Sequence, residues 1–171
     1  MGVADRLGLW TAERPERSAE LVALAEEQGL ELIRVSFADQ HGILRGKTLV
    51  VSELATVLRN GCSAPSSLLA KDTSHKTVFP IFSQGGGLGL MQMQGAADMI
   101  LLPDPQTFRI LPWAQNTGWL LCDLYFSDAR PVPFCSRSLF ARALNLAETG
   151  GHRLMAGVEL EFHLFKLRDP R

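Results

Sequence analysis

The strongest constraint on the fold is a change of hydrophobic period near the N-terminus. Residues 18–28 carry apolar side chains at helical spacing, with Ser18 in the position of an N-cap and Gly29 in that of a stop. Residues 32–50 then alternate with a period of two on both sides of the polar turn 39–42, which indicates a β-hairpin. A helix followed directly by a hairpin favours an α+β fold.

Further apolar segments follow the hairpin. Residues 52–60 return to helical spacing with Ser52 as the expected N-cap, and residues 136–149 predict another helix with one apolar stripe for packing. Between these helices lie short apolar runs that prolines interrupt, as is typical of strands. The predicted strands are residues 98–104, 107–113 and 117–126. A last alternating segment, residues 157–165, predicts one more strand.

The composition argues against several classes of protein. The 171 residues are 46% hydrophobic and 20% charged, as in an ordinary globular protein rather than a disordered one. Because 17 Lys and Arg balance 18 Asp and Glu, neither nucleic acid nor an anionic membrane is expected as a general partner. The chain has no apolar run of roughly 18 residues and no apolar core of a secretory signal near its start. We therefore expect a cytoplasmic protein.

The three cysteines are expected to have no functional role. Cys62, Cys122 and Cys135 are odd in number and do not follow a metal-binding spacing. A disulfide framework or a zinc site is therefore not expected. Buried or free thiols in a reducing compartment are the simpler interpretation.

A few other polar, aromatic and glycine residues also favour structural roles. Arg45 and Lys47 lie on one face of the second hairpin strand and are expected to be solvated or interface charges. Trp113 is expected to pack, and Asp104, between two prolines, to form a turn. The glycine-rich stretch 83–89 predicts a flexible loop, because glycine has the largest backbone entropy cost on ordering. It lacks the lysine and hydroxyl residue of a Walker loop, so a phosphate site is not expected there.

Two glutamates in the last predicted strand are the candidate metal ligands. In an extended chain Glu159, Glu161 and His163 project from the same face. The two carboxylates would be about 6.6–6.8 Å apart along the strand, so each could hold its own hard cation beside a shared phosphate. A solvated surface strand gives the same pattern. The spacing alone leaves both interpretations open, and His163 is more simply an exposed residue than a ligand.

Four segments in order resemble the N-terminal half of the glutamine synthetase family. They are VSFADQHGILRGK (35–47), AADMILLPDPQTFRILPW (97–113), GWLLCDLYF (118–126) and GVELEFHLF (157–165). The resemblance covers roughly residues 18–167. Within the family, the chain is similar above all to the branch that contains γ-glutamyl ligases for amines other than ammonia. Four segments in register are more specific than any one of them.

The resemblance implies a fold and a chemistry. After an irregular lead at 1–17, residues 18–112 would form a β-grasp domain, and 113–171 the first helix and strand of a truncated catalytic domain. The implied enzyme is an ATP-dependent glutamate–amine ligase of glutamine biosynthesis and nitrogen metabolism, which acts through γ-glutamyl phosphate. Glu159 and Glu161 match the two metal-binding glutamates of G-x-E-x-E-F and would hold Mg²⁺ or Mn²⁺, the first near the nucleotide phosphates and the second near the glutamate substrate.

The resemblance also has limits. It assigns no catalytic residue to this chain, so the 171 residues alone are expected to be inactive, while the whole enzyme would be a homo-oligomer. The family's F-D-G-S-S stretch, whose aspartate helps to bind ammonium, corresponds to residues 81–89, which contain no carboxylate. The acceptor would be ammonia or another amine, and the missing carboxylate makes a larger amine a serious competitor of ammonia. A noncatalytic β-grasp module for interaction or assembly is the alternative.

Overall fold

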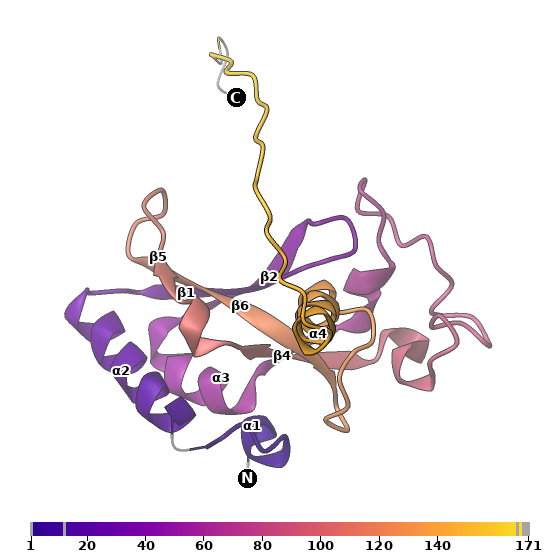
Figure 1. The fold of residues 1–171 in the computed structure, drawn as a ribbon, viewed down its shortest axis with the longest axis horizontal. Coiled ribbons are helices and arrows are strands. Elements are labelled where there is room, and N and C mark those ends of the chain that lie inside the picture. Colours follow the sequence, from indigo (N-terminus) through magenta and orange to yellow (C-terminus); the bar gives the residue numbers. More distant parts are fainter. Residues whose placement is uncertain (1, 12, 167, 169–171) are drawn as a thin grey trace.

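The computed structural model describes residues 2–11, 13–166 and 168 of the chain, which form a mixed helix and sheet structure (Figure 1). The helices are α1 (Val3–Arg6), α2 (Glu13–Glu27), α3 (Leu54–Asn60) and α4 (Ser136–Thr149). The strands are β1 (Leu32–Ala38), β2 (Leu44–Val50), β3 (Cys62–Pro65), β4 (Asp98–Pro103), β5 (Arg109–Ile110) and β6 (Thr117–Phe126). Short 3₁₀ turns are η1 (Val51–Glu53), η2 (Ser66–Ala70), η3 (Met91–Ala96) and η4 (Pro105–Thr107). The expected mixture of helices and sheet is confirmed.

Strand β6 organises the sheet, whose order is β2-β1-β6-β4-β3. Its first half pairs in parallel with β1, where Val35 lies opposite Leu120. Its other edge pairs antiparallel with β5 and then with β4. Hairpin β1–β2 forms as predicted, and Gly42 in its turn has φ of 75°, a conformation that favours glycine.

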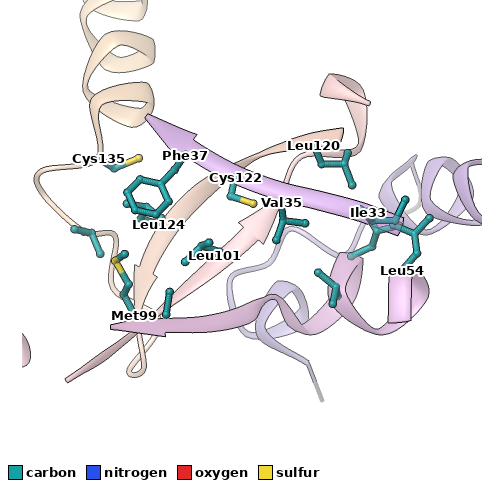
Figure 2. Packing of buried hydrophobic residues seen from close by; sticks show 14 of the residues in the cluster. Ile33, Val35, Phe37, Leu54, Met99, Leu101, Leu120, Cys122, Leu124 and Cys135 are labelled. Atoms are coloured by element: carbon teal, nitrogen blue, oxygen red, sulfur yellow. The ribbon is translucent and has the colours of Figure 1, made fainter. Parts of the chain in front are cut away.

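One hydrophobic core lies between the sheet and helices α2 and α3 (Figures 1 and 2). Alternate residues of β1 and β6 face this core, because successive side chains of a strand point to opposite sides. Leu54, Val57 and Leu58 of α3 pack against them, as the helical spacing predicts. The core side chains labelled in Figure 2 are Ile33, Val35, Phe37, Leu54, Met99, Leu101, Leu120, Cys122, Leu124 and Cys135.

Two predicted helix starts are wrong. Helix α2 begins at Glu13, and Ser18 is buried inside it instead of capping it. Residues 13–17 thus add a turn before the predicted start. Pro15 is tolerated in this turn because the first amides of a helix have no intrahelical partner. The negative charges of Glu13 and Glu16 also favour the N-terminus of a helix. Likewise, Ser52 lies within η1 and caps nothing. The predicted stop at Gly29 is consistent with its φ of 61°.

Two strands differ from the sequence prediction. Strand β3 was not predicted, because its four residues include a serine and a proline and show no clear alternation. The strand forms because it pairs with β4. The strand expected at 107–113 shrinks to β5, since η4 occupies Pro105–Thr107 and the chain turns after Ile110. The predictions at 98–104 and 117–126 match β4 and β6.

The last predicted strand does not form. Residues 152–166 are extended and exposed, and the tail runs away from the body of the molecule (Figure 1). A strand needs a neighbour to accept and donate its backbone hydrogen bonds, and no described strand lies beside this segment. Helix α4 forms as predicted, but none of its residues is buried, so its apolar stripe has no partner among the described residues. None of the helices in the described ranges is both long and apolar enough to cross a membrane.

Candidate functional site

The two candidate metal ligands lie in the exposed tail. Glu159 and Glu161 are exposed, as is His163. The rings of His163 and Phe165 lie 6.2 Å apart, as expected when side chains two residues apart project from the same side of an extended chain. Within residues 2–11, 13–166 and 168, no group of three or more His, Cys, Asp or Glu side chains could hold a metal ion.

The donor chemistry of this pair suits a hard cation only in part. Carboxylate oxygens are ligands that Mg²⁺ and Mn²⁺ prefer. Octahedral Mg²⁺ needs six oxygens at about 2.0–2.1 Å, however, and two separated glutamates supply too few. Glu159 and Glu161 could therefore contribute to a metal site only if further oxygen ligands converge on them.

The structure brings together a buried ion pair that the sequence interpretation missed. At the hairpin turn, Arg45 Nε donates to Asp39 Oδ2 over 2.6 Å, and the two side chains are only 8% and 0% exposed. The other Asp39 oxygen accepts hydrogen bonds from the amides of His41 and Ile43. Arg45 Nη1 also lies 3.2 Å from His75 Nδ1, on the loop that follows η2. Arg45 is thus a buried structural charge in this chain, and the expectation that it is solvated is wrong.

Electrostatics keep Asp39 ionised although it is buried. Burial alone would raise the pKa of this carboxyl. The hydrogen bonds from Arg45, His41 and Ile43, together with the positive charge of Arg45, outweigh burial and hold the pKa below its usual value. The spacing of six residues across a tight turn was the available signal for this pair, because it places Asp39 and Arg45 on facing ends of a hairpin.

A second set of ion pairs joins α4 to the sheet. Arg137 contacts Asp104 Oδ2 and Asp123 Oδ1, the latter at 2.8 Å. The side chain of Asp104 also accepts a hydrogen bond from the amide of Gln106 at the start of η4, which confirms the predicted turn role. Burial would lower the pKa of Arg137, but the two aspartates reverse this effect and raise it. The pairs fix the first turn of α4 against β6.

Three other side chains complete the comparison with the sequence predictions. Trp113 is 75% exposed, so its predicted packing role is wrong. Lys47 is exposed, as expected. The cysteines are free thiols as predicted, and burial raises the pKa of the Cys122 thiol well above its usual value. A buried, protonated thiol is a poor nucleophile.

Comparisons with known proteins give relatives along nearly the whole chain. No protein-family model matches. A gamma-glutamylanilide synthase from Acinetobacter is 35% identical over 94% of this chain and 33% of its own length. A glutamine synthetase from Methanosarcina mazei is 30% identical over 86% of this chain and 30% of its own length. The chain thus spans about a third of the length of these curated relatives.

A solved structure agrees with the sequence comparison. A complex of GmaS with ADP matches 76% of this chain and 26% of its own chain, with a TM-score of 0.58 and 27% identity. The similarity therefore extends from the sequence to the fold of most of the described residues.

Proposed function

We propose that this chain is the N-terminal part of an ATP-dependent glutamate–amine ligase of the glutamine synthetase family, because it is similar to such proteins over about a third of their length. In the proposed reaction the γ-carboxylate of glutamate takes the terminal phosphoryl group of ATP. An amine then attacks the acyl phosphate and releases phosphate. The observation that carries this proposal is the 35% identity to a gamma-glutamylanilide synthase over 94% of the chain.

The domain arrangement belongs to the same proposal. Residues 18–112 would form a β-grasp domain, and residues 113–171 would begin the catalytic domain of a cytoplasmic homo-oligomer. The β1–β2 hairpin and the helix α3 after it support the first part. Strand β6 lies past residue 112 in the chain, but it pairs with β1 and β4 and so completes the same sheet. The unpartnered stripe of α4 and the extended tail support the second, because both expose apolar side chains that a larger domain would cover.

Glu159 and Glu161 would be the metal ligands of the whole enzyme. Their carboxylates suit Mg²⁺ or Mn²⁺, and other parts of the enzyme would supply the remaining oxygens. A bound divalent ion would neutralise charge on the reacting phosphate and carboxylate groups. The role of this chain is then to present two acidic side chains from an extended segment that pairs with a sheet in the whole enzyme. Its ATP and glutamate sites would lie mostly outside these 171 residues, so the chain alone would be inactive.

The acceptor amine would be larger than ammonia. Residues 73–97, which cover η3 and most of the loop before it, contain no Asp or Glu. An ammonium ion needs an anionic partner when it leaves water, and this stretch offers none. The carboxylate of Asp72, at the start of the loop, is already bound by Ser74 and the amide of Lys76. Apolar side chains are exposed there instead, among them Phe79, Phe82 and Met91. These features favour an uncharged or apolar amine.

A noncatalytic assembly module is the second candidate. The exposed Leu139, Phe140 and Leu146 of α4 favour it, because an uncovered apolar helix face is typical of an interaction surface. The two candidates differ in whether the natural protein that contains this chain turns over ATP with glutamate and an amine.

An assay with several amines tests the ligase proposal. The natural protein that contains these residues would be incubated with glutamate, Mg-ATP and ammonia, ethylamine or aniline, and γ-glutamyl amides would be measured by mass spectrometry. We expect an amide product with release of ADP, and a kcat/KM for the best organic amine at least about tenfold above that for ammonia. Failure to form any amide across the panel would favour the assembly module, and equal or better use of ammonia would contradict the acceptor assignment.

A further inference from the structure

An apolar cavity lies beside the hairpin turn, apart from the acidic pair of the tail. Its volume is about 470 Å³, which is within the range of about 300–1,000 Å³ found for small-molecule sites. Leu69, Phe79, Leu88 and Phe134 supply its apolar wall. These residues come from η2, from the loop between η2 and η3, and from the segment before α4. The cavity is large enough for a molecule with one or two rings.

The polar groups that line the cavity include no acid. They are Gln40, His41 and Lys71, and Lys71 is the one with a permanent positive charge. The nearby Asp39 is bound by Arg45 and two amides. Asp72 is likewise bound within its own turn, by Ser74 and the amide of Lys76. Both acids are therefore already compensated, and the positive charge of Lys71 is available to a ligand.

Contacts within the loop hold Lys71 in place. Its ammonium donates to the carbonyl oxygen of His75 over 3.0 Å and to Thr77 Oγ1 over 3.4 Å. Arg45 contacts the imidazole of the same His75, so the loop is tied to the buried ion pair of the hairpin. Two of the three ammonium hydrogens of Lys71 are used by these bonds, and the third can bind an acceptor. A fixed cation at the edge of an apolar cavity is preorganised for an anionic group.

We propose that this cavity binds a small aromatic carboxylate, with the ring against Phe79, Leu88 and Phe134 and the carboxylate on Lys71. The ring removes apolar wall from water, and the carboxylate accepts a charge-assisted hydrogen bond. An aromatic ammonium ion of the same size is disfavoured, since its charge would meet Lys71 without a free acid to compensate it. This site is independent of the proposed ligase activity and can be measured on the 171-residue chain itself.

Titration of the chain with benzoate tests the site. We expect benzoate to bind with amide NMR shifts concentrated at His41, Lys71 and Phe79, and benzylamine to bind at least about tenfold more weakly. Lys71→Met should weaken benzoate binding about tenfold, since a hydrogen bond to a charged group is lost. Phe79→Ala should weaken it several-fold through the lost ring contact.

Two matched variants separate the cavity from general charge and hydrophobicity. Lys76→Met removes a lysine of the same turn, and Phe82→Ala removes an exposed phenylalanine of the same loop; neither residue lines the cavity. Both should leave the benzoate Kd within about twofold. Absence of benzoate binding, equal binding of benzylamine, or equal effects of Lys71→Met and Lys76→Met would each overturn the assignment.

Discussion

Replacing Arg45 with leucine is expected to lower the free energy of unfolding by about 3–5 kcal/mol, because it leaves the buried Asp39 carboxylate without its counter-charge. The carboxylate keeps two amide donors, so the loss should fall toward the lower end of this range. Urea unfolding of the 171-residue chain, followed by far-ultraviolet circular dichroism, measures the effect. For most domains this is a large share of the total stability.

Two further variants show whether the buried charge causes the loss. Arg130→Leu breaks an ion pair with Asp128 whose side chains are 65% and 42% exposed, and it should cost about 1 kcal/mol or less. Asp39→Asn added to Arg45→Leu should recover part of the stability, because an amide oxygen can accept the same two backbone hydrogen bonds without a charge. A loss below about 1 kcal/mol for Arg45→Leu would contradict the role assigned to this pair.

Under the proposed ligase function, replacing Glu159 or Glu161 with glutamine in the natural protein that contains this chain is expected to lower kcat/KM at least about a hundredfold. Loss of one metal carboxylate should remove several kcal/mol of transition-state stabilisation, and each 1.36 kcal/mol corresponds to about a factor of ten. Steady-state kinetics of the natural protein, with Mg²⁺ varied at saturating ATP and glutamate, would measure this loss. The metal concentration for half-maximal activity should rise as well.

Glu148→Gln is the matched control for these variants. Glu148 is an exposed glutamate near the end of α4 and takes no part in the proposed metal site. Its activity should stay within about twofold of the unmodified protein. Unchanged turnover of Glu159→Gln and Glu161→Gln at every Mg²⁺ concentration would remove the metal assignment and leave the pair as a solvated acidic face.

Local sequence patterns predicted most of the fold. The hairpin, β4, β6 and the helical face of Leu54, Val57 and Leu58 follow from periodicity, turn residues and glycine stops. The errors lie where contacts between distant segments decide the structure. Strand β3 exists only because β4 lies beside it, and its own residues carry little signal.

The candidate site was less predictable than the fold. Alternation correctly placed Glu159 and Glu161 in an extended segment, but a strand also needs a partner, and the described chain offers none. The ion pair of Asp39 and Arg45 was missed because burial of a charge depends on the loop around His75, which is far away in sequence. Trp113 shows the reverse error, since its hydrophobicity suggested packing and its position after β5 leaves it exposed.

The central claim is that the natural protein containing this chain activates glutamate as an acyl phosphate. The most direct test supplies glutamate labelled with ¹⁸O in its γ-carboxylate, together with Mg-ATP and the preferred amine, and measures the mass of the released phosphate. If the carboxylate oxygen attacks phosphorus and stays with it when the amine displaces phosphate, each phosphate carries one ¹⁸O atom. Phosphate without the label, released from ATP by water, would contradict the account.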